Sequence, residues 1–171
     1  MKNEKLYIYF YPNEQEEATK LLERIKSLGL SAEFINLDQQ PDDTKLVSGL
    51  VEKSVDPFPV LRVGELKIRA VFNNPQLELL EKIFAIDSKN QLNLPQPTIY
   101  STTWCGDCKQ LKFWMDSQKL TNKEILIEDS EELKDQIYRW SGGRRVIPTI
   151  SYESIGRLFN PGIAFFQKLY L

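Results

Sequence analysis

The sequence contains no histidine, and this absence narrows the possible chemistry more than any other feature of its composition. It excludes Ser-His-Asp and Cys-His catalysis, histidine general bases and histidine ligands for metals. Only two cysteines are present, Cys105 and Cys108, so the chain lacks the disulfide framework that small secreted proteins use. Because they share one four-residue window, these two cysteines are placed to react with each other.

Net charge and long apolar runs are also lacking. Twenty-two basic and 24 acidic residues leave a net charge of -2, so the protein has no net positive charge to attract nucleic acid or an anionic membrane. No run of about 18 apolar residues occurs, and residues 1–5 lack the features of a signal peptide. We therefore expect a soluble cytoplasmic protein with neither nucleic-acid nor membrane partners.

The order of expected elements repeats once along the 171 residues, a length that allows one domain or two small ones. In the first half, β-forming runs and apolar periodicity predict strands at 5–11, 32–37, 58–63 and 66–71 and helices at 14–28, 42–53 and 74–83. In the second half they predict strands at 98–101, 124–128, 149–152 and 157–159 and helices at 105–119, 130–140 and from 160 onward.

Three landmarks keep nearly the same spacing in both halves, as small loop deletions in a duplicated unit would produce. The equivalent pairs are Ile8-Tyr9 and Ile99-Tyr100, Pro59 and Pro148, and Asn74-Pro75 and Asn160-Pro161. Each Asn-Pro pair is expected to be a cap residue followed by proline at the first helical position. The alternative is a chance likeness between two generic α/β stretches.

Each half thus has the order β-α-β-α-β-β-α, which predicts an α/β fold. This order folds naturally as a four-stranded mixed sheet, with a parallel βαβ unit and an antiparallel hairpin, covered by helices on both faces. We predict one domain at residues 1–88 and a second at 97–171, joined by a polar, proline-containing linker at 89–96.

The cysteine pair is expected at the start of a helix, directly after a strand. Free backbone N–H groups at a helix N-terminus stabilise a thiolate over a thiol, so Cys105 is the candidate nucleophile. Cys108 lies one helical turn further on and is the candidate resolving thiol. Gly106 would permit a tight start to the helix, and Trp104 would shield one side of the disulfide.

The charged neighbours of the pair have two interpretations. Asp107 would oppose the thiolate, whereas Lys109, Lys112, Arg144 and Arg145 would favour it, and the sign of the sum is open. Asp107 could equally be a first-turn acid that complements the helix dipole. A structural or zinc-binding role for the cysteines is the competing interpretation, although zinc normally needs four ligands and the sequence offers no histidine or third cysteine.

The stretch Thr102-Thr103-Trp104-Cys105-Gly106-Asp107-Cys108, followed by Val146-Ile147-Pro148-Thr149, resembles the glutaredoxin family. Together with Leu158-Phe159-Asn160-Pro161 it is most similar to the mycoredoxin-like branch. The motifs cover residues 97–171, whereas residues 5–86 share only the order of elements. The resemblance implies two tandem thioredoxin/glutaredoxin-like domains, the first without redox cysteines.

The resemblance also implies how a substrate would bind. It places a cis peptide before Pro148, facing the cysteines, with the backbone of Ile147 pairing with the bound thiol peptide. The candidate substrate-binding residues are Trp104, Gly106, Asp107, Lys109, Arg145, Val146, Ile147, Pro148 and Asn160.

Two departures from related families bear on the reductant. Residues 153–156 and 160–162 lack the Gly-Gly and acidic residue with which many glutaredoxins hold glutathione, which argues against glutathione. Ile99 replaces the buried carboxylate of thioredoxins, and no residue is an obvious general base for Cys108.

Two further features have a functional and a structural interpretation. Arg144 and Arg145 either attract the carboxylate of a low-molecular-weight thiol or an acidic partner, or form a solvated loop after a glycine-stopped helix. The first half carries acidic residues at 13–17 where the second has its cysteines, so it cannot exchange electrons. It either packs against its neighbour or binds an extended peptide near Pro59.

The hypothesis is a glutaredoxin-like thiol-disulfide oxidoreductase that acts on disulfides of proteins or small molecules. No tightly bound cofactor is expected, and glutathione or an analogue, or a reductase, is a candidate reductant. The alternatives are a non-catalytic peptide-binding or adaptor module, or a dimer that holds an iron-sulfur cluster through the same cysteines.

Overall fold

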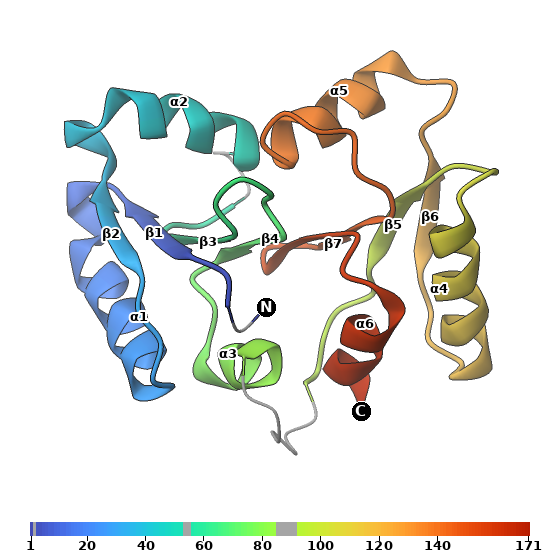
Figure 1. Ribbon diagram of the computed structural model, residues 1–171, viewed down its shortest axis with the longest axis horizontal. Helices are drawn as coiled ribbons and strands as arrows, with labels where there is room; N and C mark the ends of the chain where they lie inside the picture. The colour runs from blue at the N-terminus through green and yellow to red at the C-terminus, as the bar shows by residue number, and fades with distance from the viewer. Residues whose placement is uncertain (2, 53–55, 85–91) are drawn as a thin grey trace.

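The computed structural model describes residues 1, 3–52, 56–84 and 92–171 (Figure 1). The first half contains β1 (Leu6–Phe10), η1 (Pro12–Glu14), α1 (Gln15–Ser27), β2 (Glu33–Asn36), η2 (Leu37–Gln39), α2 (Pro41–Leu50), β3 (Val60–Val63), β4 (Ala70–Asn73) and α3 (Leu77–Phe84). The second contains β5 (Thr98–Ser101), α4 (Gly106–Ser117), β6 (Lys123–Leu126), α5 (Glu131–Trp140), β7 (Thr149–Tyr152), β8 (Gly156–Phe159) and α6 (Ile163–Tyr170). The predicted order of strands and helices is present in both halves.

All eight strands belong to one sheet, in the order β2-β1-β3-β4-β8-β7-β5-β6. The prediction of a separate four-stranded sheet in each half is wrong in this respect. Each half does contribute a parallel pair and antiparallel pairs, but β4 and β8 then join them edge to edge. Residue 53 of a predicted helix and residues 89–91 of the predicted linker lie outside the described residues.

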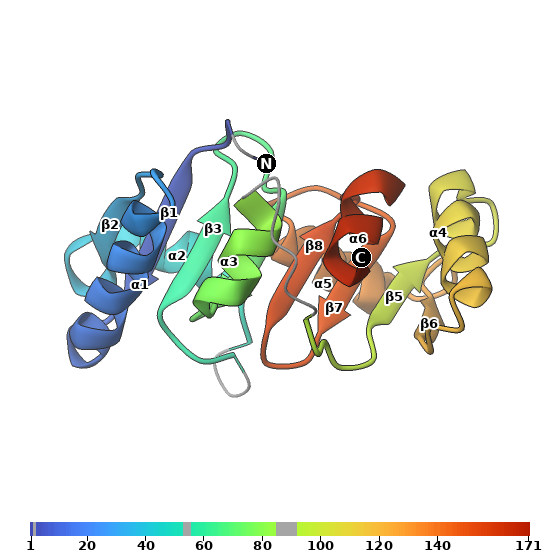
Figure 2. The ribbon, with the colours of Figure 1, turned by 90° about the horizontal axis from the view of Figure 1, so that it is seen from below.

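Helices cover both faces of this sheet and define two apolar layers. α1, α3, α4 and α6 lie below the sheet, and α2 and α5 lie above it (Figures 1 and 2). The lower layer includes Leu21, Leu80, Met115 and Phe166, one from each of its helices, and the upper layer includes Trp140. All five residues of β1, which lies next to the edge strand β2, are buried because helices cover the sheet on both faces.

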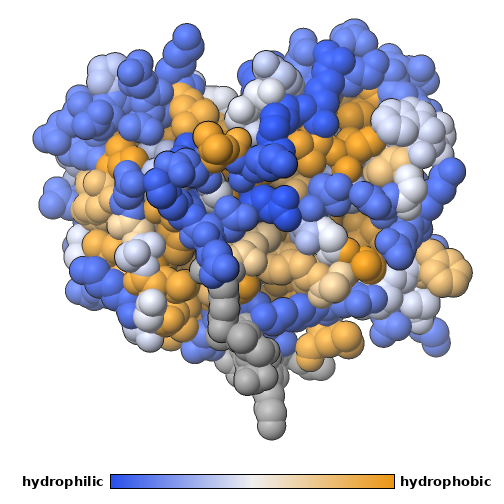
Figure 3. Space-filling view, in the orientation of Figure 1, coloured by the Kyte–Doolittle hydropathy of each residue, from blue (hydrophilic) through white to orange (hydrophobic). Residues whose placement is uncertain are grey.

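The outer surface carries charged and polar residues over the helices, and the upper outline is notched between the two halves (Figure 3). The outermost strands β2 and β6 are partly exposed, as expected of sheet edges. No helix in the described part of the chain is both long and apolar enough to cross a membrane.

The seam between the halves depends on a close approach of two backbones. β4 and β8 pair in antiparallel fashion, with Phe72 opposite Gly156. Gly156 has φ +147°, and a Cβ atom there would lie 2.2 Å from the carbonyl oxygen of Val71. Only glycine fits this position, because both the space and the backbone conformation exclude a side chain.

A buried ion pair also crosses the seam. Arg157 of β8 donates to Asp56 over 2.9 Å, and the two side chains are only 6% and 3% exposed. The same guanidinium donates to the carbonyl oxygen of Leu50 and lies 4.1 Å from the ring centroid of Trp140. The first half therefore supplies the counter-ion of a buried charge in the second.

The two Asn-Pro pairs do not cap helices as predicted. α3 begins at Leu77, and the cap residue of α6 is Gly162. Asn74 and Asn160 instead adopt positive φ angles of 40° and 42°. Their backbone N–H groups donate to the carbonyl oxygens of Pro59 and Pro148, which ties each hairpin to its proline segment.

The second strand of the first hairpin also begins later than predicted. β4 begins at Ala70 and not at residue 66, and Leu66 is exposed. The turn is closed where the Arg69 N–H donates to the carbonyl oxygen of Val63. The residues between β3 and β4 are therefore a loop, because pairing resumes only after this bond.

Candidate functional site

Cys105 and Cys108 form a disulfide at the N-terminus of α4. Their sulfur atoms are 2.07 Å apart. Cys105 is the cap residue of the helix, and its Sγ accepts a hydrogen bond from the Cys108 N–H at 3.1 Å. Both residues are buried, Cys105 being 6% and Cys108 1% exposed, so the cysteine at the helix end is the more accessible residue of the two.

The proline segment lies beside this pair. The Ile147-Pro148 peptide bond is cis, as the resemblance implied, and Pro148 and Asp107 line the same cavity. Thr149 Oγ1 donates to the carbonyl oxygen of Val146, which holds the segment before β7. Val146 and Ile147 are partly exposed, and no hydrogen bond joins the backbone of Ile147 to another described residue.

The cavity has a volume of about 120 Å³ and lies between the starts of α4 and α6. Its lining residues are Asp107, Gln110, Leu111, Pro148, Asn160, Pro161, Gly162 and Ile163. Asn160 Nδ2 donates to Asp107 Oδ2 at 3.1 Å, which links the two sides. The structure thus brings Pro148 and Asn160 to the same cavity as Asp107, the residue that precedes Cys108.

The basic residues predicted to attract an anionic thiol are held elsewhere. Arg145 lies 3.8 Å from Glu131 and 3.9 Å from Asp135, both on α5. Arg144 donates to the carbonyl oxygen of Ile68 in the first half. None of the lysines or arginines is among the residues that line the cavity. Lys109 is exposed on α4.

Comparison with known proteins places this site in a family. The glutaredoxin family model matches residues 98–153. A Mycobacterium tuberculosis protein named as a glutaredoxin is 33% identical over 64 residues, which cover 37% of this chain and 76% of the relative. Mycoredoxin 1 of Corynebacterium glutamicum is 31% identical over 64 residues, which cover 37% of this chain and 78% of the relative.

The chain belongs to the glutaredoxin family. The family model covers part of the second half, including the cysteine pair and Pro148, and does not extend to the first half. Residues 97–171 are called the glutaredoxin half below. The close cysteine pair in a glutaredoxin domain supports thiol-disulfide oxidoreductase activity in general.

Of two expectations about the neighbours of Cys105, the one for Gly106 needs correction and the shielding by Trp104 stays a prediction. Gly106 is not required for a tight start to the helix, because its φ is not positive and a Cβ atom there would meet nothing within 4 Å. Trp104 is 72% exposed, so most of its ring faces solvent.

Sequence reasoning missed a carboxylate that holds the loop before Cys105. Glu128 Oε2 accepts a hydrogen bond from the Thr103 N–H at 2.7 Å. A signal was available, because Glu128 is the last residue of the strand predicted at 124–128, which was expected to run parallel beside residues 98–101. The carboxyl ends of such strands meet at one edge of the sheet.

A second missed group lies beneath this loop. Glu124 accepts from Ser101 Oγ at 2.5 Å and from Lys112 Nζ at 2.6 Å. Burial by itself would raise the pKa of Glu124, but the bonds from Lys112 and Ser101 outweigh it and lower the pKa below its ordinary value. Lys112 is therefore paired with this carboxylate.

The first half repeats the scaffold of the site without its sulfur. The Phe58-Pro59 bond is cis, and Asn74 makes the same backbone bond to its proline as Asn160 does. Where the glutaredoxin half has Cys105, the first half has the short helix η1, and Glu14 there accepts from the Tyr11 N–H.

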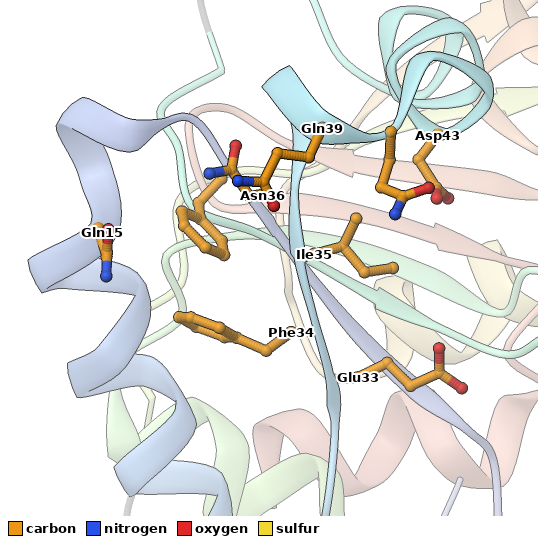
Figure 4. Close-up of a pocket in the computed structure, with 9 residues that line it drawn as sticks. Gln15, Glu33, Phe34, Ile35, Asn36, Gln39 and Asp43 are labelled. Atoms are coloured by element: carbon orange, nitrogen blue, oxygen red, sulfur yellow. The ribbon is translucent and has the colours of Figure 1, made fainter.

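A larger cavity of about 570 Å³ lies in the first half, along the free edge of β2. Figure 4 shows Phe34 and Ile35 directed to opposite sides of this strand, with Gln15 on α1 and Asp43 on α2. It shares no lining residue with the cavity beside the cysteines.

Proposed function

We propose that the chain exchanges electrons with disulfides of proteins or small molecules through Cys105 and Cys108. The supporting observation is the position of Cys105, whose sulfur caps α4 and which is the more exposed residue of the pair. A thiolate at this position is stabilised by the helix N-terminus and is the attacking species in disulfide exchange.

In the reaction, the Cys105 thiolate attacks one sulfur of the substrate disulfide. The substrate S–S bond breaks, one thiolate leaves, and a mixed disulfide forms with Cys105. Cys108 then loses its proton and attacks the Cys105 sulfur, which expels the second substrate thiol. Two electrons have moved to the substrate, and the protein holds the Cys105–Cys108 disulfide.

The segment 146–148 is proposed to receive the substrate backbone. Its support is the partly exposed position of Val146 and Ile147, directly before Pro148, which lines the same cavity as Asp107, and the absence of a hydrogen-bond partner for the Ile147 backbone among the described residues. The candidate reductants are a low-molecular-weight thiol and a dedicated reductase. Offering glutathione, another small thiol and a thioredoxin reductase system in parallel to the oxidised protein would identify the reductant.

Substitution of each cysteine tests this proposal. Cys105→Ser is expected to abolish reduction of a model disulfide, because the nucleophile is lost, and Cys108→Ser is expected to accumulate mixed disulfides that mass spectrometry detects. Activity retained by Cys105→Ser would contradict the mechanism. A coloured protein whose dimer depends on Cys105 would favour the cluster-binding alternative.

A further inference from the structure

The cavity beside the disulfide has an unusual charge for a site that would receive an anionic thiol. Asp107 belongs to the redox motif itself, and its carboxylate lines the cavity together with Asn160. The Asn160 side-chain amide donates to Asp107 Oδ2 at 3.1 Å and so directs one carboxylate oxygen toward the start of α6. Of the residues that line the cavity, Asp107 is the one with a charged side chain.

The cations that could offset this charge are paired with other groups or lie outside the cavity lining. Lys112 is bonded to Glu124, and Arg145 lies near two carboxylates of α5. Arg144 is bonded to a backbone carbonyl of the first half. Lys109 is exposed and does not line the cavity. A substrate group that enters this cavity therefore meets a carboxylate without a neighbouring cation in its lining.

We infer that Asp107 selects substrates by charge, favouring disulfides that carry a cationic or neutral group next to the sulfur over those that carry a carboxylate. This inference rests on the proposed exchange reaction at Cys105. Asp107 acts on the approaching substrate, and Asn160 positions its carboxylate. The preferred substrates are disulfides with an amine, or peptides with a basic residue, beside the reacting cysteine.

The expected size of the preference follows from screened charge interactions. Two unit charges about 6 Å apart at a solvent-exposed site interact only weakly. The interaction would change the rate of disulfide reduction by a factor of about three to about ten. The effect should shrink as salt is added, because the carboxylate is exposed.

The test compares three small disulfides in single turnover. Fully reduced protein is mixed with excess cystamine, bis-hydroxyethyl disulfide or dithiodiglycolate, which are cationic, neutral and anionic, and the loss of protein thiols is followed. Each turnover converts one disulfide to two thiols and oxidises the cysteine pair. The intrinsic reactivities of the three disulfides differ, so the measured quantity is the ratio of the Asp107→Asn rate to the wild-type rate for each.

We expect Asp107→Asn to accelerate the anionic disulfide and to slow the cationic one, each by about threefold to tenfold relative to the neutral disulfide. Asp107→Glu should keep most of the wild-type preference because it retains the charge. Asp116→Asn, the same change at an exposed position of α4 outside the cavity lining, should alter none of the ratios.

Two results would overturn the inference in distinguishable ways. If Asp107→Asn changed all three rates by one common factor, Asp107 would act on the reactivity of the cysteines and not on the substrate. If the wild-type protein reduced none of the three disulfides, the proposed function would fail, and the selection with it.

Discussion

At the scale of single residues, the reactive pair is held by contacts from several elements. Glu128 holds the loop before Cys105, the Cys108 N–H binds the Cys105 sulfur, and Asn160 binds Asp107. Beneath the loop, Glu124 joins Ser101 of β5 to Lys112 of α4. The strand and the helix that flank the disulfide are thus fastened to each other by one carboxylate.

The lowered pKa of Glu124 predicts a pH dependence of stability. A carboxyl group whose pKa is lower in the folded than in the unfolded protein stabilises the fold above its unfolded pKa of about 4.3, and this contribution is lost as pH falls through the folded value. Lys112→Met should therefore reduce the free energy of unfolding by about 0.5–1 kcal/mol at neutral pH. The difference from wild type should vanish in acid, as urea unfolding at a series of pH values would show.

Lys123→Met is the matched control for this prediction. It removes the same charge from an exposed residue next to Glu124 in β6, outside the Lys112–Glu124 pair. It should leave the acid dependence unchanged. An equal loss of stability in both variants, or a loss in Lys112→Met that persists at low pH, would count against the pairing.

Part of the site was visible in the sequence because its signals are local. The spacing of Cys105 and Cys108 and their place after a strand require only nearby residues, and Pro148 is recognisable in its motif. The partners of Arg144 and Arg145 were not predictable, because they lie on the first half and on α5. The hydrogen-bond and ion-pair partners of long flexible side chains can be distant in sequence, and they become neighbours only when the chain folds.

At the scale of elements, the seam between β4 and β8 predicts a sharp difference between two glycines. Gly156→Ala should destabilise the protein by about 2–4 kcal/mol, because its Cβ would overlap the Val71 carbonyl and its φ is positive. Gly106→Ala should change stability by less than about 1 kcal/mol, since the space there is open. Thermal unfolding of both variants measures the difference, and similar midpoints would refute the seam geometry.

The order of elements was predictable, whereas the joining of the two sheets was not. Periodicity of apolar residues reports which face of an element is buried. It does not report which distant strand covers an edge, and the pairing of β4 with β8 joins segments more than eighty residues apart in sequence. The prediction that the Asn-Pro pairs cap helices was wrong for a related reason. The N–H groups of Asn74 and Asn160 donate to the distant proline segments and not to a helix turn.

At the scale of the whole molecule, the buried pair of Asp56 and Arg157 should couple the stability of the two halves. Arg157→Met leaves the Asp56 carboxylate buried without its counter-ion, which typically costs about 3–5 kcal/mol. Arg145→Met is the matched control, because it removes the same charge from an exposed, loosely paired position and should cost less than about 1 kcal/mol.

Cooperative unfolding provides a further check at this scale. All three tryptophans, Trp104, Trp114 and Trp140, lie in the glutaredoxin half, so their fluorescence reports that half and, through Trp140, its contact with the first half. Circular dichroism reports the helices and strands of both halves. We expect the two signals to change together in denaturant, because one sheet runs through the molecule. Separate transitions would show that the halves unfold independently.

The seam also bears on what the cysteine-free half is for. Without the first half, β8 would be an edge strand whose outer backbone groups have lost their partners in β4. Arg157 would lose its counter-ion Asp56 beside an apolar layer. The cysteine-free half covers the β8 edge and supplies the counter-ion of Arg157, so we expect the fold of the half that carries the cysteines to depend on it. Natural selection for redox activity would then also constrain seam residues such as Asp56 and Gly156, which contact no substrate.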